Sequence, residues 1–205
     1  LVQPTAAPVC IGRCAGAGCI DRAIAAAFAL VRDLRTAGTV VFDVGGVIVR
    51  WQPLALLRQV LPQHAPDEAA AHALALQIFQ RFEVGSDWAA FDRGAVQPAA
   101  LADRIAARTG IAVHDLRALI DAIPQHLQPK ADTLALMWRL KARGHRLCIL
   151  SNMPASYADH LEAAHACFAW CDVRVFSARV GHIKPEAAMF EYAQQACALD
   201  LRRSI

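Results

Sequence analysis

A short apolar run that leads directly into a carboxylate and two glycines constrains this chain more than any other feature. Residues Thr39 to Phe42 are all β-branched or aromatic, Asp43 follows them, and Gly45 and Gly46 come just after. Such a run, bounded by turn residues, is typical of a strand buried on both faces in a parallel sheet. Ligands bind at the carboxyl ends of such strands, so Asp43 is either a site residue or a simple turn cap.

Length and charge narrow the classes of protein. The chain has 205 residues, which suits one domain or a domain with an insertion. Its net charge of +3 is scattered along the sequence, so we expect no nucleic-acid partner. No apolar run approaches the ~20 residues of a membrane span, and we expect no membrane association.

The cysteines favour a reducing compartment. The seven cysteines lack paired CxxC spacing, which argues against a zinc site or a disulfide framework. Cys148 lies in a strand-like run and Cys197 on a helical stripe, where buried free thiols are common. We therefore expect a cytoplasmic protein.

The first 38 residues differ from the rest of the chain. They are rich in Ala, Gly, Pro and Cys, and their first half has no usable period. We interpret residues 1–38 as a poorly ordered extension, with the natural start of the protein near Val31.

Residues 51–129 show only helical patterns. Helices are predicted over Pro53–Val60, Asp67–Phe82, Pro98–Arg108 and Asp115–Ile123 from apolar residues at three- and four-residue steps. Between two of them, Trp88 to Gly94 is interpreted as a loop whose aromatic pair serves packing. On that loop Asp92 and Arg93 can face a ligand.

Residues 130–205 alternate between helix and strand. Helices are predicted over Ala131–Arg143, Pro154–Ala166 and Pro185–Ala198, with strands at Arg146–Leu150 and Val173–Phe176. Alternation at this length implies right-handed crossovers and a parallel sheet. We therefore predict an α/β fold with a Rossmann-like core, residues 39–50 and 130–205, and an inserted helical cap, residues 51–129.

Polar groups stand at or just after the predicted strand ends. They are Asp43, then Ser151 with Asn152, then Lys184. A carboxylate nucleophile, phosphoryl-binding hydroxyl and amide groups, and a fixed ammonium are what phosphoryl transfer through an aspartyl-phosphate requires. Each residue alone also has a plain interpretation, with Ser151 as a helix cap and Lys184 as a solvated lysine.

In their order, these residues resemble the motifs of the haloacid dehalogenase superfamily. The first motif matches Phe42 to Val47, the second Ile149 to Asn152, and the third Lys184-Pro185. The resemblance implies that Asp43 is the nucleophile, that Ser151, Asn152 and Lys184 bind the phosphoryl group, and that Lys184 neutralises its charge. It also implies Mg2+, held by the Asp43 carboxylate and the Gly45 carbonyl.

Two departures from the family pattern matter. Many of its phosphatases carry a second Asp where this chain has Gly45, so a positioned general acid is lacking and the leaving group should be relatively acidic. The pattern resembles a sugar-phosphate branch that includes glucose-1-phosphate phosphatase-like proteins. The acidic pair of the fourth motif is not found after Lys184, so we expect the C-terminal strands to be missing from this chain.

Three function classes remain open. The first is a Mg2+-dependent phosphomonoester hydrolase acting on a small phosphorylated metabolite, at least for the full-length parent of this chain. The second is a metal-free dehalogenase-type hydrolase. The first motif of that branch resembles Asp-x-Tyr, whereas this chain has Gly45 in place of the Tyr. The third is a non-catalytic fragment or binding module.

Overall fold

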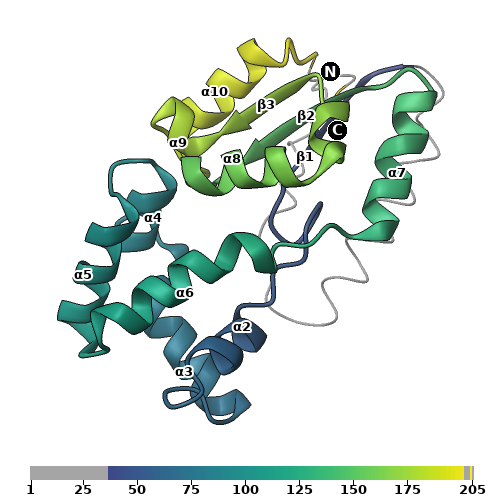
Figure 1. Cartoon of the computed structure of the whole chain (residues 1–205). Helices are drawn as coiled ribbons and strands as arrows, with labels where there is room; N and C mark the ends of the chain where they lie inside the picture. The colour runs from purple at the N-terminus through teal and green to yellow at the C-terminus, as the bar shows by residue number, and fades with distance from the viewer. Residues whose placement is uncertain (1–36, 201–203, 205) are drawn as a thin grey trace, which may run out of the picture.

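Three parallel strands form a sheet within the part of the chain that the structure describes. The computed structural model describes residues 37–200 and residue 204. The strand order is β1-β2-β3, with both neighbouring pairs parallel (Figure 1). Phe42 lies opposite Ile149, and Ser151 lies opposite Phe176, so the strands end along one edge. The predicted α/β fold with a parallel sheet is confirmed. The strands are β1 (Thr39–Phe42), β2 (Arg146–Ser151) and β3 (Val173–Phe176).

Alternate side chains of β2 enter different apolar layers. Leu147 and Ile149 belong to a large cluster with residues of α7 and α8, whereas Cys148 and Leu150 join a smaller cluster with α10. Because strand side chains alternate between faces, the sheet has helices on both sides. Figure 1 shows α8 and α10 on opposite sides of the strands. The elements of this part are α7 (Ala131–Ala142), α8 (Ala155–Ala164), η3 (Ala166–Trp170), α9 (Ser177–Val180) and α10 (Ala187–Ala196).

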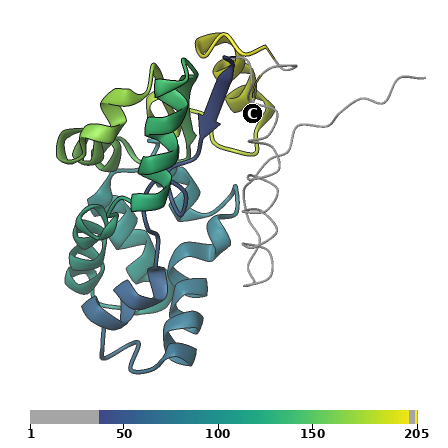
Figure 2. The same cartoon turned by 90° about the vertical axis from the view of Figure 1, so that its right-hand side faces the viewer.

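The chain between β1 and α7 is helical and gathers below the sheet in both views (Figures 1 and 2). In α5, Leu101 and Ile105 are fully buried, as their four-residue spacing predicts. The ring of Phe79 contacts those of Trp51 and Trp88 edge-on, which adds aromatic packing to the bundle. The elements are α2 (Pro53–Val60), α3 (Glu68–Phe79), η2 (Gln80–Phe82), α4 (Asp87–Asp92), α5 (Pro98–Thr109) and α6 (Val113–His126).

The chain leaves for these helices and returns from them at one place. Val49 and Pro129 form an antiparallel bridge, and the Arg50 amide donates to the Gln128 carbonyl over 2.8 Å. The Lys130 amide donates to the Ile48 carbonyl over 2.9 Å. These paired segments lie at the predicted boundaries of the cap, and the division into core and cap domains stays a prediction.

The predicted loop from Trp88 to Gly94 was wrong. Residues Asp87–Asp92 form helix α4, whose first turn is capped by the Ser86 hydroxyl accepting from the Ala89 amide over 3.0 Å. The helix stops because Gly94 adopts a φ of 79°, a left-handed conformation that suits glycine.

Other differences concern the ends of elements. The helix predicted to reach Phe82 ends at Phe79, because Gln80, Arg81 and Phe82 have positive φ and form η2. Strand β1 is less buried than predicted, since Thr39 to Val41 are half-buried. It hydrogen-bonds to β2 on one side, and Ser204 forms a parallel bridge with Thr39.

Some expectations lie outside the described residues. The extension predicted for residues 1–38 falls there except for its last two residues, as do Cys10, Cys14 and Cys19. The described cysteines are free and buried, which confirms the prediction for Cys148 and Cys197. Across residues 37–200, no helix combines the length and apolarity needed to traverse a bilayer.

Candidate active site

Asp43, Ser151 and Lys184 meet where β1 and β2 end. The Ser151 hydroxyl donates to Asp43 Oδ1 over 2.8 Å, and the Lys184 ammonium lies 2.9 Å from Asp43 Oδ2. The parallel register of β1 and β2 brings Asp43 beside Ser151 across a sequence separation of 108 residues. The structure therefore brings together three of the residues that the sequence singled out.

The loop after β1 fixes the Asp43 carboxylate and leaves it accessible. The Val44 amide donates to Asp43 Oδ1 over 2.7 Å. The Val44 carbonyl accepts from the amides of Val47, Ile48 and Val49 at 2.9 to 3.1 Å, which closes a tight turn. The Asp43 side chain keeps 27% of its surface exposed. A carboxylate that has partners at both oxygens and is still partly exposed can meet a substrate.

Lys184 is held at both its backbone and its ammonium group. The Lys184 amide donates to Asn152 Oδ1 over 2.7 Å, and Asn152 Nδ2 donates to the Lys184 carbonyl over 3.0 Å. Lys184 Nζ also donates to the Leu150 carbonyl over 3.1 Å. The Asn152 side chain therefore clamps the backbone of Lys184, and the phosphoryl contact expected of it stays a prediction.

Asp92 and Arg93 are not arranged as a loop that faces solvent. Asp92 ends α4, is only 6% exposed, and its carbonyl accepts from the Ser177 hydroxyl. Arg93 makes a two-pronged ion pair with Glu186, with 2.7 Å between Arg93 Nη1 and Glu186 Oε2. The substrate role expected of both residues stays a prediction.

The ion pair dominates the electrostatics of Glu186. The hydrogen bonds from Arg93, and then the bond from the Ile183 amide, lower the pKa of Glu186 to about 2. Glu186 is therefore ionised at neutral pH. The sequence placed Glu186 only in a helix, and nothing local links it to Arg93 because 93 residues separate the two.

The described donor set suits a hydrated magnesium ion. Mg2+ prefers oxygen ligands, keeps several waters, and is commonly bound through one or two carboxylates plus substrate phosphates. Asp43 offers a carboxylate, and Gly45 lies two residues later in an exposed position with a backbone carbonyl. Among residues 37–200 no cluster of three or more His, Cys, Asp or Glu side chains forms a fuller metal cage.

Two side chains from the start of α7 hold the loop that follows Asp43. The Lys130 ammonium donates to the Gly46 carbonyl over 3.0 Å, and the Thr133 hydroxyl donates to the Val47 carbonyl over 2.8 Å. Sequence analysis missed both residues. A possible signal was their position at the N-terminal end of a helix that follows the insertion directly.

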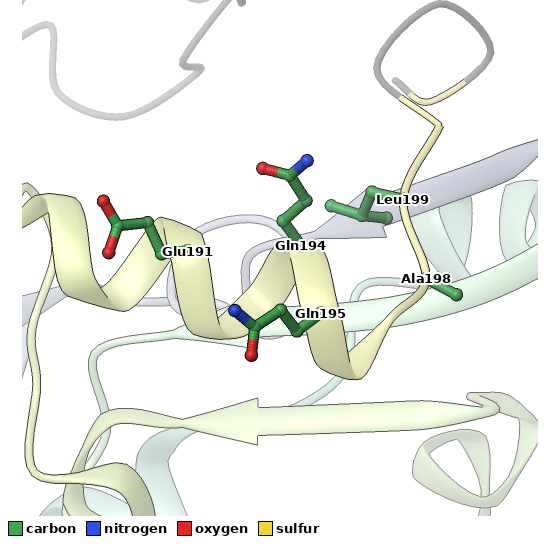
Figure 3. A pocket seen from close by; sticks show the side chains of 5 residues that line it. All are labelled: Glu191, Gln194, Gln195, Ala198 and Leu199. Atoms are coloured by element: carbon green, nitrogen blue, oxygen red, sulfur yellow. The ribbon is translucent and has the colours of Figure 1, made fainter.

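A shallow surface pocket lies elsewhere, along α10. Figure 3 shows the side chains that line it, which come from the last turns of α10 and the two residues after Cys197. They include one carboxylate and two amides but none of Asp43, Ser151 and Lys184, so we do not assign this pocket to the candidate active site. Its lining consists of Glu191, Gln194, Gln195, Ala198 and Leu199.

Comparisons with known proteins bear on the family of the chain. A family model described as haloacid dehalogenase-like hydrolase matches residues 37–205. The sesquiterpene phosphatase astK of Aspergillus oryzae is 22% identical over 152 residues, which span 74% of this chain and 70% of the relative.

Two solved structures share the fold. The HAD family enzyme BT-2542 of Bacteroides thetaiotaomicron, in complex with magnesium and inorganic phosphate, has a TM-score of 0.61 at 15% identity, covering 82% of this chain and 83% of that one. The L-2-haloacid dehalogenase of Xanthobacter autotrophicus has a TM-score of 0.59 at 16% identity, covering 82% of this chain and 68% of that one.

Proposed function

Because the chain belongs to the haloacid dehalogenase-like hydrolases, we propose that it is a Mg2+-dependent phosphomonoester hydrolase that works through an aspartyl-phosphate on Asp43. The observation that carries the proposal is the carboxylate of Asp43, which is fixed by the Val44 amide and the Ser151 hydroxyl, paired with Lys184, and still partly exposed. A positioned nucleophile beside a fixed cation suits attack on an anionic phosphoryl group.

The proposed reaction has two steps. A carboxylate oxygen of Asp43 attacks phosphorus while the bond to the leaving oxygen breaks, and the leaving oxygen takes a proton from water. Water then attacks the phosphorus of the acyl phosphate, which releases inorganic phosphate and restores the Asp43 carboxylate. The Lys184 ammonium and the Ser151 hydroxyl stabilise the charge that gathers on the phosphoryl oxygens.

Magnesium would be held by the Asp43 carboxylate and the Gly45 carbonyl, where it would neutralise charge on the bound phosphoryl group. Lys184 itself neutralises part of the charge of Asp43. The ion would therefore add to the charge neutralisation that the Lys184 ammonium provides at this carboxylate.

The substrate proposed is a small phosphorylated metabolite whose leaving group is relatively acidic. Gly45 has no side chain to protonate a leaving alkoxide, which favours an anomeric hydroxyl such as that of a sugar 1-phosphate. A reducing compartment, the cytoplasm, fits the free and buried cysteines of the described residues.

Phosphate release by the purified 205-residue chain tests this function. We expect hydrolysis of p-nitrophenyl phosphate and of sugar 1-phosphates to require millimolar Mg2+, and Asp43→Asn to lower turnover by at least about 10³-fold. Asp103→Asn is the matched control, since Asp103 is an exposed partner of Arg117 on the helical bundle. Turnover of Asp43→Asn within tenfold of the wild type, at unchanged thermal stability, would rule out Asp43 as the nucleophile.

A metal-independent release of chloride from 2-chloropropionate would instead favour the dehalogenase alternative. Absence of both reactions in folded protein would favour a binding module. Each result contradicts the phosphatase proposal in a different way.

A further inference from the structure

The segment that carries Lys184 is short and lies between two helices. It runs from Gly181, which ends α9, to Glu186, which precedes α10. The Glu186 amide donates to the Ile183 carbonyl over 2.9 Å, and the Ile183 amide donates to Glu186 Oε2 over 3.2 Å. These bonds form a compact turn, so a contact that holds Glu186 in place also holds the turn that contains Lys184.

Arg93 contacts both ends of this segment. Its guanidinium donates to the Gly181 carbonyl over 3.3 Å and binds both carboxylate oxygens of Glu186. A planar guanidinium can serve a carboxylate with two parallel bonds, which fixes direction as well as distance. Arg93, which directly follows α4, therefore ties together the two ends of the segment that carries Lys184.

The backbone that carries Arg93 is itself docked on the sheet side. The Asp92 carbonyl accepts from the Ser177 hydroxyl, and Ser177 Oγ in turn accepts from the Met153 amide over 2.8 Å. On the other side of Arg93, Gly94 lies so close to Ala178 that a Cβ there would stand 2.8 Å from the Ala178 carbonyl oxygen. Arg93 is thus anchored on both sides to the region where β3 meets α9.

These contacts complement those of Asn152, which directly follows β2. Asn152 holds the amide and carbonyl of Lys184 itself, whereas Arg93 holds the ends of the segment on either side. We propose that Arg93 is a positioning residue of the reaction site, which holds the Lys184 ammonium against Asp43 through its bonds to Glu186 and Gly181. The consequence for turnover rests on the proposed phosphatase function, while the placement of Lys184 does not.

The lysine content of the chain allows a direct measurement of that placement. The whole sequence has only three lysines, Lys130, Lys141 and Lys184. After reductive 13C-methylation, their dimethylamino signals can be followed by NMR and assigned with Lys184→Arg. In Arg93→Ala we expect the Lys184 signal to move toward the position of a solvated lysine, while the signals of Lys130 and Lys141 stay in place.

Two further variants separate placement from folding. Arg104→Ala is the matched control, because Arg104 belongs to the same helical bundle and its ion pair within the described residues is a long one, 3.9 Å to Asp87. It should leave all three signals unchanged. Arg93→Lys keeps the charge but cannot form the two-pronged contact, so it should shift the Lys184 signal in the same direction as Arg93→Ala. Glu186→Gln gives the same test from the other partner if Arg93→Ala fails to fold.

The activity arm uses the same variants. We expect Arg93→Ala to lower kcat by about 10- to 100-fold, because a misplaced group costs that much even far from the chemistry. Combining Arg93→Ala with Glu186→Gln should add little to either single change, as expected for partners in one contact. A Lys184 signal in folded Arg93→Ala identical to that of the wild type would overturn the proposal. Absence of phosphate release in the wild type would overturn the function alone, since the NMR result stands without turnover.

Discussion

At the scale of single residues, Gly45 matters most for the proposed chemistry. A Cβ added at Gly45 would meet no heavy atom within 4 Å, and Gly45 is not among the described glycines with positive φ, unlike Gly46 at 77°. The absence of a side chain at Gly45 is therefore not imposed by space or by backbone conformation. An acid can be placed there without strain.

Gly45→Asp should supply a proton to the leaving group. We expect kcat/KM for alkyl phosphates to rise by about 10²-fold relative to kcat/KM for aryl phosphates, because only poor leaving groups need protonation. Gly45→Asn, which has the same shape and no acidic proton, serves as the control. Equal changes for both substrate types in Gly45→Asp would show that leaving-group protonation does not limit the rate.

The Arg93–Glu186 pair makes part of the stability dependent on pH. The pKa of Glu186 falls from an ordinary value of 4.5 to about 2 in the folded protein, mainly through Arg93. A carboxyl with a depressed folded pKa stabilises the protein above its unfolded pKa and loses that effect as pH falls toward the folded pKa. His182, whose Nδ1 lies 3.8 Å from Glu186, adds to the depression when protonated.

The difference in unfolding free energy between wild type and Glu186→Gln should therefore be constant from neutral pH to about 5 and shrink between about 4.5 and 2. Urea unfolding at a series of pH values measures it. A difference that stays constant down to pH 2 would mean that the Glu186 pKa is not depressed.

At the scale of elements, helix α4 depends on a close approach to α9. Gly94, just after α4, has both a positive φ and a Cβ position blocked by the Ala178 backbone, whereas Gly110 after α5 has a similar φ of 75° and open space. Gly110→Ala should cost about 1–2 kcal/mol of stability for the backbone conformation alone. Gly94→Ala should cost about 1–3 kcal/mol more, because the overpacked contact must also shift. Thermal unfolding of the two variants compares them, and equal losses would show that α4 is not fixed by this contact.

The elements that sequence analysis predicted well are those with strong local patterns. β-branched and aromatic residues marked Thr39–Phe42 and, with Arg174 among them, Val173–Phe176, and Pro98 with Gly110 marked the two ends of α5. Helix α4 was missed because its six residues are too few to show a period. The signal that could have found it is Ser86, the helix cap, placed three residues before Ala89.

The same division applies to the site. Asp43, Ser151 and Lys184 could be named because each follows or lies near a strand end and has a chemically distinctive side chain. The contacts of Asn152 with the Lys184 backbone and of Arg93 with Glu186 could not be predicted. They depend on tertiary contacts between residues that are 32 and 93 positions apart, respectively. Local patterns in one sequence carry no information about such contacts.

At the scale of the whole molecule, the helical bundle and the sheet share one apolar core. The large buried cluster contains Leu57 of α2 and Leu147 of β2 together. Tyr157 of α8 joins the two parts directly, because its hydroxyl donates to the Ile120 carbonyl of α6 over 2.7 Å and its ring meets that of Phe91 at 5.5 Å. Burial raises the pKa of Tyr157 well above its ordinary value, so the phenol stays protonated and keeps donating.

A shared core predicts that bundle and sheet unfold together. Leu57→Ala and Leu147→Ala each remove a fully buried side chain, one from each part, and each should cost about 2–5 kcal/mol. Calorimetry should show a single transition in the wild type, and both variants should lower its midpoint by roughly 5–15 °C. Leu57→Ala would split the transition in two, and leave the upper one in place, if the bundle unfolded on its own. Because Arg93 reaches Glu186 from that bundle, a separate early transition would also break the contact between Arg93 and Glu186 before the sheet unfolds. The segment that carries Lys184 would then lose this support.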